Sequence, residues 1–280
     1  MLDIIIDTLT DTIKLLPFLF IAFLIIEIIE HKLNEQNKEV IQKSGKYGPI
    51  IGGIIGAIPQ CGFSTMATNL YITRIISLGT LISIYLSCSD EMLPILLSKQ
   101  VSLSTIVTIL SIKIAIGIIS GIIIDLLTRK NNNKFNYNIC NDEHCHCEDN
   151  NIIKSSFSHT IKIGFYILTI NFVLNTLFFY IGEEYLSKIL LNGNIFSSFI
   201  IGLIGLIPNC ASSVIITELY LNKAISFGAT MAGLLAGSGI SLFILFKSNK
   251  NIKENITILG LVYFIGVLSG IIIDLINIIL

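Results

Sequence analysis

The chain has 280 residues, of which 53% are hydrophobic and only 13% are charged, and its formal net charge is −1. Soluble domains carry roughly 25% charged residues, so the composition predicts an integral membrane protein that has the lipid bilayer as its main partner. The near-neutral charge, without a basic patch, predicts no nucleic-acid partner. The six cysteines are split between apolar segments and a polar linker, which excludes the disulfide framework of a small secreted domain.

Apolar runs of the length needed to cross a bilayer, about 20 residues, occur on both sides of a polar segment. The first set covers about 13–29, 48–71, 75–97 and 101–127, and the second covers about 161–181, 196–220, 224–246 and 256 onward. The asparagine-rich, charged segment between them is typical of a solvated linker. We therefore expect a first membrane repeat over residues 1–128, a linker over 129–152 and a second membrane repeat over 153–280.

The two halves match in one register, at a shift of 149 residues and without a gap. The aligned pairs are Pro59 with Pro208, Cys61 with Cys210, Gly79 with Gly228, and Ser120–Asp125 with Ser269–Asp274. Such a register predicts two homologous halves.

The second apolar run of each half is interrupted by proline and glycine, which decides the topology. At 1.5 Å per residue, the ten residues 49–58 reach about 15 Å, roughly half of a 30 Å bilayer core. A hairpin that enters and leaves on one side gives three crossings per half, and the halves are then inverted. A single crossing gives four crossings and parallel halves.

The placement of lysine and arginine separates these alternatives, because cytoplasmic loops are enriched in both. With the amino terminus outside, the hairpin topology places twelve on the inner side: Lys32, Lys38, Lys43, Lys46, Arg74, Arg129, Lys130, Lys134, Lys154, Lys247, Lys250 and Lys253. Four fall outside, namely Lys14, Lys99, Lys188 and Lys223. Lys113 and Lys162 fall within spans and are not counted. The single-crossing topology splits the charge between the two sides.

We therefore predict an all-α integral membrane protein with two inverted-topology repeats. Each repeat has three full spans and one broken, re-entrant helical hairpin, which gives ten helical segments in all. The linker over 129–152 is expected in the cytosol.

The two interruptions are the first candidates for a binding site. A break in a helix leaves backbone N–H and C=O groups without hydrogen-bond partners. Within the membrane such groups are tolerated only where they are buried in protein or line a water-filled cavity. Interruptions at corresponding positions of two halves are typical of a transporter binding site. We expect the tips Pro59-Gln60-Cys61 and Pro208-Asn209-Cys210 to meet near the midplane. A helix that starts at each cysteine lowers its pKa, and the thiolate binds metal. The alternative is that each cysteine is a small buried hydrophobe.

Acidic residues supply a second set of candidates. Asp90 and Glu91 follow Cys88 well inside an apolar run, where carboxylates are functional hypotheses by default. The alternative is that they cap a helix that ends early, near Pro94. Glu218 aligns with Asn69 and is either a ligand or proton carrier, or a residue that reaches the outer interface. Asp125 and Asp274 lie near helix ends, where capping is the favoured role.

The linker contains a cluster of five soft or borderline ligands within eight residues: Cys140, His144, Cys145, His146 and Cys147. Thiols and imidazoles suit capture of zinc, copper(I) or another thiophilic ion. Their spacing matches no zinc-finger class, and the alternative is a polar tether. No nucleotide-binding or hydrolase motif is present, so we expect no enzyme activity, no cofactor, and transport driven by a gradient or a partner.

These segments resemble a known bacterial family of ten-segment heavy-metal exporters, related to the arsenical permeases and also described as manganese transporters or arsenic efflux proteins. The resemblance is carried by Gly56–Gly62, Gly205–Ala211, Ser89–Leu96, His144–Cys147 and Met231–Leu235. It implies export of a metal or metalloid ion across the bacterial inner membrane by a multi-pass protein. A homo-oligomer is a further partner hypothesis, separate from the resemblance.

Two substrate hypotheses follow. A soft metalloid such as trivalent arsenic would be held by the thiolates of Cys61, Cys210 and Cys88. A harder ion, manganese above all, would be held by Asp90, Glu91, Glu218 and Asn69. Proton-coupled alternating access is expected in either case. The competing function is a non-transporting membrane metal sensor or accessory subunit that acts through the linker.

Overall fold

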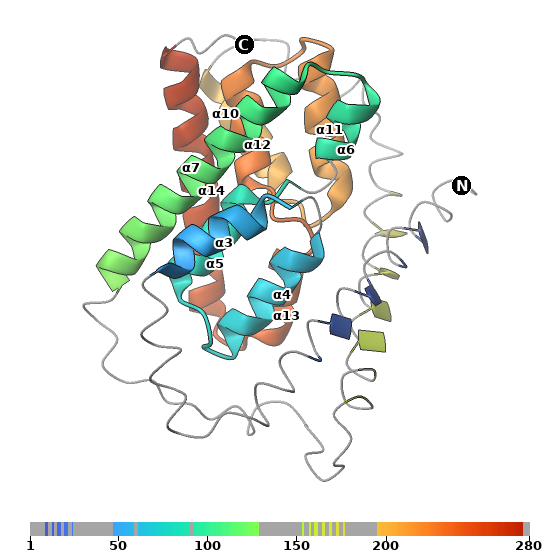
Figure 1. Cartoon of the computed structure of the whole chain (residues 1–280), viewed down its shortest axis with the longest axis vertical. Helices are drawn as coiled ribbons and strands as arrows, with labels where there is room; N and C mark the ends of the chain where they lie inside the picture. Colours follow the sequence, from blue (N-terminus) through green and yellow to red (C-terminus); the bar gives the residue numbers. More distant parts are fainter. Residues whose placement is uncertain are drawn as a thin grey trace.

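A computed structural model describes residues 47–58, 61–89, 92–128 and 195–276, together with single helical residues between 9 and 24 and between 153 and 176. Within this part of the chain every regular element is a helix, as the composition and the apolar runs predict (Figure 1). The predicted linker over 129–152 lies outside the described residues.

The described helices of the two halves follow the same pattern along the chain, with four short helices before one long helix. In the first half they are α3 (Gly48–Gly56), α4 (Cys61–Ile72), α5 (Leu78–Ser87), α6 (Met92–Ser98) and α7 (Leu103–Thr128). In the second half they are α10 (Ile195–Gly205), α11 (Cys210–Leu221), α12 (Phe227–Ala236), α13 (Ser241–Ser248) and α14 (Ile252–Ile276). Two pairs of short helices are thus followed by one long helix in each half.

Local contacts also recur at the shift of 149 residues. Ser77 caps the start of α5 and donates its hydroxyl to Asp125 Oδ2 over 2.6 Å, and the Gly79 N–H donates to Asp125 Oδ1 over 2.8 Å. The second half repeats these contacts over 2.7 and 2.8 Å, among Ser226, Gly228 and Asp274. The two aspartates therefore anchor helix starts, which is the role that the sequence favoured.

The core is built on α5 and α12. All residues from Gly79 to Ser87 and from Gly228 to Ala236 are buried. The helices α3 and α7 pack against α5, α10 and α14 pack against α12, and α5 and α12 also contact each other. The outer faces of α7 and α14 expose large apolar side chains, for example Leu103, Ile123, Ile256 and Phe264. This is the surface expected for helices that face lipid.

Four stretches of the described residues are long and apolar enough to cross a membrane: Leu78–Ser98, Leu103–Thr128, Phe227–Ser248 and Ile252–Ile276. At 1.5 Å per residue, the 26 residues of α7 measure about 39 Å, which exceeds a bilayer core of about 30 Å.

The runs 75–97 and 224–246 were expected as full spans, and each contains two helices with an interruption between them. In the first, α5 ends at Ser87 and α6 starts at Met92, and in the second, α12 ends at Ala236 and α13 starts at Ser241. The backbone turns extended after each helix, at Cys88 with ψ 128° and at Gly237 with ψ 102°. Gly239 then adopts a φ of 56°, a left-handed conformation that glycine reaches without steric cost.

The contacts of α3 show the path of the first interrupted segment. A Cβ on Gly48 would lie 2.2 Å from Thr80 Oγ1, in the first turn of α5, and one on Gly56 would lie 2.8 Å from the Ile84 carbonyl. Hence α3 runs alongside α5 in the same direction. Only residues 73–77 connect α4 back to the start of α5. Both ends of the segment 48–72 therefore lie at the same end of α5.

The halves are interlocked at both ends of the molecule. The helix α6 packs against α11, and α13 packs against α4 (Figure 1). The colours of Figure 1 show that α7 and α14 run in opposite directions. The described residues between 9 and 24 also contact those between 153 and 176, since the rings of Phe20 and Phe157 meet edge to face with centroids 6.4 Å apart.

Candidate functional site

Three helix interruptions meet in a buried polar pocket between the two halves. The pocket is lined by Cys88 and Ser89 after α5, by Lys113 of α7, by Asn209, Ser212 and Ser213 at the start of α11, and by Leu234, Gly237 and Gly239 around the end of α12. Its volume is about 10 Å³, which is room for a single water-sized occupant. The first half and the second half thus contribute to one site.

The start of α11 brings polar groups to this pocket. Asn209 is buried, and its carbonyl accepts the Ser212 hydroxyl over 2.7 Å. The helix begins at the next residue, Cys210, just after Pro208. The amides of a first helical turn have no partner within the helix and give that end a partial positive charge. The pocket therefore contains the positive end of a helix.

The start of α4 is the equivalent position in the first half. This helix begins at Cys61, so the prediction that a helix starts at each paired cysteine is confirmed in both halves. Ser64, Thr65 and Thr68 of α4 are fully buried. Thr68 Oγ1 lies 2.6 Å from the hydroxyl of Tyr85, which is itself buried in α5. A row of hydroxyls therefore follows the first turn of α4 into the core.

Lys113 places a cationic group in the pocket. Its side chain is 1% exposed, and its Nζ donates to the carbonyl of Leu234 over 2.7 Å and to the carbonyl of Cys88. These two carbonyls belong to the ends of α12 and α5. Sequence reasoning set this residue aside as a lysine within a span. The signal that could have found it is the rule that an ionisable side chain inside the membrane is a functional candidate.

The structure brings some of the predicted site residues together and places others apart. Cys88 and Asn209 line the pocket, and Pro208 directly precedes Asn209 in the sequence. Asn69 is buried in α4, and its Nδ2 has no hydrogen-bond partner within the described residues. Glu218 is partly exposed near the end of α11. Neither Asn69 nor Glu218 lines the pocket.

Several predicted residues cannot be placed. Pro59, Gln60, Asp90 and Glu91 lie outside the described residues, as do the five linker ligands Cys140, His144, Cys145, His146 and Cys147. For Cys61 and Cys210 the structure describes the helical backbone and not the side chain. Among the side chains that it does describe, no three from His, Cys, Asp and Glu come together. The proposed ligand sets therefore stay predictions.

Two more polar atoms are buried beside the interruptions. Ser87 Oγ, at the last residue of α5, and Ser238 Oγ, after α12, lie fully buried without a hydrogen-bond partner in the described part of the protein. Buried polar groups without partners are uncommon and call for an explanation such as a bound water or ion. Both interruptions thus offer oxygen atoms in addition to their backbone carbonyls.

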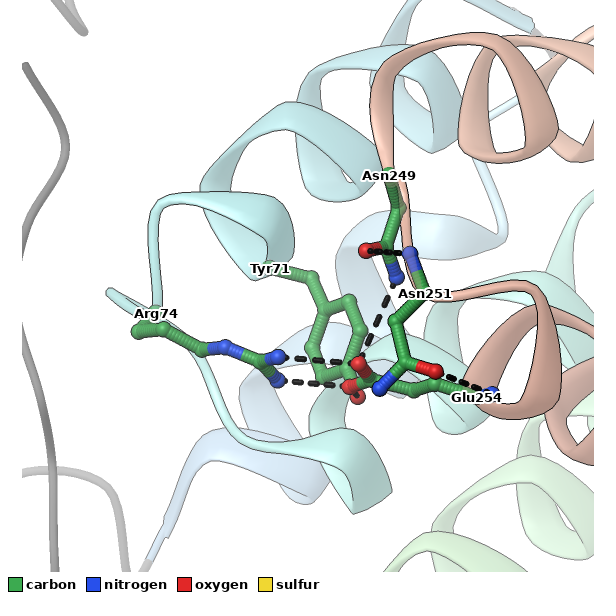
Figure 2. Close-up of polar contacts among 5 residues, drawn as sticks. All are labelled: Tyr71, Arg74, Asn249, Asn251 and Glu254. Atoms are coloured by element: carbon green, nitrogen blue, oxygen red, sulfur yellow. Dashed lines mark hydrogen bonds and ion pairs between the residues drawn. The ribbon is translucent and has the colours of Figure 1, made fainter. Parts of the chain in front are cut away.

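A second polar cluster ties the halves together away from the pocket (Figure 2). Arg74, which follows α4, forms two hydrogen bonds of 2.6 and 2.9 Å with the carboxylate of Glu254 in the first turn of α14. Tyr71 donates to the same carboxylate, Asn249 Nδ2 donates to it over 3.4 Å, and the Asn251 side chain accepts the Glu254 N–H. The hydrogen bond to Glu254 raises the pKa of Arg74, so the guanidinium stays charged.

The opposite end of the molecule is held more loosely. There, Lys99 after α6 lies 3.8 Å from Glu218 of α11. The position equivalent to Glu254 is Thr105, whose N–H donates to the Ser102 hydroxyl over 3.3 Å. The bidentate pair of Figure 2 therefore has no counterpart among these residues.

Comparison with known proteins identifies the family. A family model described as "Putative, 10TM heavy-metal exporter" matches residues 1–179 and 164–278, which is nearly the whole chain. No curated protein and no solved structure matches significantly. The apolar helices and the family together show a multi-pass membrane protein. The chain belongs to the family of ten-transmembrane-segment heavy-metal exporters.

Proposed function

We propose that the protein is a secondary transporter that exports a soft metal or metalloid ion, such as trivalent arsenic, through the pocket between its two halves. One observation carries the proposal: a buried thiol, Cys88, lies with Asn209 where three helix interruptions meet. Interrupted helices supply free backbone groups at membrane depth, and this is how secondary transporters build their sites. The family supports export as the direction.

The contacts at the two ends of the molecule support inverted repeats. The pair Arg74–Glu254 joins the end of α4 to the start of α14, and the pair Lys99–Glu218 joins the end of α6 to α11. With three crossings per half, both partners of each pair fall on one side of the membrane. With four crossings, each pair would be divided between the two sides. The opposite directions of α7 and α14 agree with three crossings.

The lengths of the short helices support re-entrant hairpins. The nine residues of α3 and the twelve of α4 span about 14 and 18 Å, against a core of about 30 Å. Both ends of this segment lie at the start of α5. In our proposal the two hairpin tips approach from opposite faces of a bacterial inner membrane, with the linker over 129–152 in the cytosol.

Thiols favour the soft ion over the harder one. Of the residues assigned to a manganese site, Asp90 and Glu91 lie outside the described residues. Glu218 is near Lys99, and Asn69 does not line the pocket. Cys88 does line it, Cys210 starts α11, whose first turn lines the pocket, and Cys61 starts the equivalent helix α4. Thiolates prefer soft ions, and carboxylates prefer hard ones.

The test is resistance in a bacterial host that lacks its own efflux systems. Cys61→Ser, Cys88→Ser and Cys210→Ser are each expected to lower arsenite resistance to that of the empty host, because serine removes the soft ligand. Asp90→Asn is expected to retain it. Cys140→Ser changes a cysteine of the linker and is the matched control, with most of the resistance kept. If the three variants protect as well as wild type while Asp90→Asn loses manganese resistance, the ion is a hard one.

Proton coupling is proposed because the chain has carboxylates in its apolar segments and no nucleotide-binding motif. In inverted membrane vesicles that contain the wild-type protein in their membrane, collapse of the pH gradient by a protonophore is expected to stop arsenite uptake. Collapse of a sodium gradient should leave the rate unchanged. Uptake that continues at the same rate without a pH gradient would contradict proton coupling.

A further inference from the structure

Lys113 is buried in the middle of a long apolar helix, where a charged side chain is costly. It is the eleventh residue of the 26 in α7, and 1% of it is exposed. Its Nζ reaches the carbonyls of Cys88 and Leu234, which lie 146 residues apart in the sequence. The equivalent residue of the second half is Val262, also fully buried. One half therefore supplies a cation that contacts both halves.

The acceptors explain why a cation is placed there. The helix α5 ends at Ser87, and Cys88 is the residue that caps it, while α12 ends at Ala236, two residues after Leu234. The last carbonyls of a helix have no intrahelical partner and carry partial negative charge. Two such ends meet inside the protein, away from water. In other secondary transporters, half-helix carboxyl ends of this kind coordinate a sodium ion or a proton.

We propose that Lys113 is a tethered cation that takes the place of a bound monovalent ion and holds the carboxyl ends of α5 and α12 together. The ammonium group neutralises both helix ends and fixes the position of Cys88 and Ser89 at the pocket. Lys113 lines the pocket itself, and we assign it as a positioning residue because it holds the two helix interruptions that supply Cys88 and Ser89. The protein consequently needs no sodium ion for its central structure. The effect on export rests on the function proposed above, whereas the effect on stability does not.

The decisive experiment is cation rescue of the purified protein. Lys113→Ala removes the ammonium and leaves a space that a small cation can enter. In sodium chloride or methylammonium chloride its melting temperature is expected to rise by at least 5 °C relative to N-methyl-D-glucamine chloride of equal concentration, since the last cation is too large for the space. The wild type is expected to melt at one temperature in all three salts.

Two variants separate charge from packing. Ile109→Ala opens a cavity at a fully buried residue one turn away in α7, and it is expected to lose stability in every salt without rescue. Lys113→Gln keeps hydrogen-bond donors without the charge, and it is expected to fold but to export arsenite at least tenfold more slowly than wild type.

The outcomes distinguish this proposal from the proposed function. Lys113→Ala melting independently of the cation, or Lys113→Gln equal to wild type in both stability and export, would overturn the tethered cation. A wild type whose melting temperature rises with sodium would overturn it as well. If cation rescue occurs but the wild-type protein moves no metal or metalloid, the tethered cation stands and the transport function is wrong.

Discussion

Gly228→Ala is expected to destabilise the protein by at least about 3 kcal/mol and to lower its melting temperature by roughly 10 °C. A Cβ at this position would lie 2.2 Å from the Gly270 carbonyl oxygen and 2.5 Å from Asp274 Oδ1. Both atoms belong to α14. The Gly270 oxygen is backbone, and the Asp274 carboxylate is held in place by hydrogen bonds from the Ser226 hydroxyl and the Gly228 N–H. The methyl group would force α12 from α14 and weaken the hydrogen bond from the Gly228 N–H to Asp274. Thermal unfolding of the purified protein measures the effect.

Gly79→Ala tests the same contact in the first half, where the Cβ would lie 2.1 Å from the Gly121 carbonyl oxygen. The control is Gly260→Ala, also in α14. That glycine is exposed and has no atom within 4 Å of the added carbon, so the melting temperature should stay or rise slightly, because alanine favours helix by up to about 1 kcal/mol. If Gly228→Ala and Gly260→Ala melt alike, the close approach of α12 and α14 is wrong.

The sequence predicted those features that follow from strong local rules. A proline followed by an apolar run ends one helix and precedes the next, and α11 starts two residues after Pro208 as expected. The aligned Asp125 and Asp274 were expected to cap or anchor helix ends, and each anchors the start of another helix, α5 or α12. Apolar length and few charges predicted the membrane-crossing helices. Each of these predictions was made from local sequence, although the helix starts that the two aspartates anchor lie 46 residues away.

The interruptions after α5 and α12 could not be predicted in this way. Both helices are buried all round, so their apolar pattern has no periodicity that would show where a helix stops. Cys88 and Ser89 also tolerate a helix. The turn there is stabilised by groups distant in sequence, above all by Lys113 of α7. A single-sequence reading of local pattern contains no information about that contact, although the Gly237-Ser238-Gly239 segment was a partial signal.

The two halves agree in scaffold residues and differ at the centre. The serine caps, the capping aspartates and the close glycines recur at the shift of 149 residues. At this shift, the residue equivalent to Lys113 is Val262, and the residue equivalent to Cys88 is Gly237. Symmetric positions thus maintain the fold, while the polar pocket receives its thiol and its cation from the first half. The positions at which the halves differ therefore include the two side chains that give the pocket its thiol and its ammonium group.

Ser213→Leu is expected to reduce export about 100-fold, a loss of roughly 2.7 kcal/mol of transition-state stabilisation, while the protein still folds. Ser213 lines the pocket from the first turn of α11 and is only partly buried. The pocket has room for about one water-sized occupant, and leucine places three carbon atoms where serine has a single hydroxyl oxygen. A substrate that must enter this pocket cannot share the space with a branched side chain. Arsenite efflux from loaded cells measures the rate.

Ser213→Ala is the control, because it removes the hydroxyl without filling the pocket, and it is expected to keep export within a few-fold of wild type. Both variants should melt within a few degrees of wild type, since the side chain is not part of the packed core. Loss of export in the leucine variant alone then means that the space itself is the path of the ion. Unchanged export in Ser213→Leu, with the protein folded, would place the substrate elsewhere and remove the pocket from the mechanism. Loss in both variants would instead make the Ser213 hydroxyl a ligand, which the alanine variant distinguishes from occlusion.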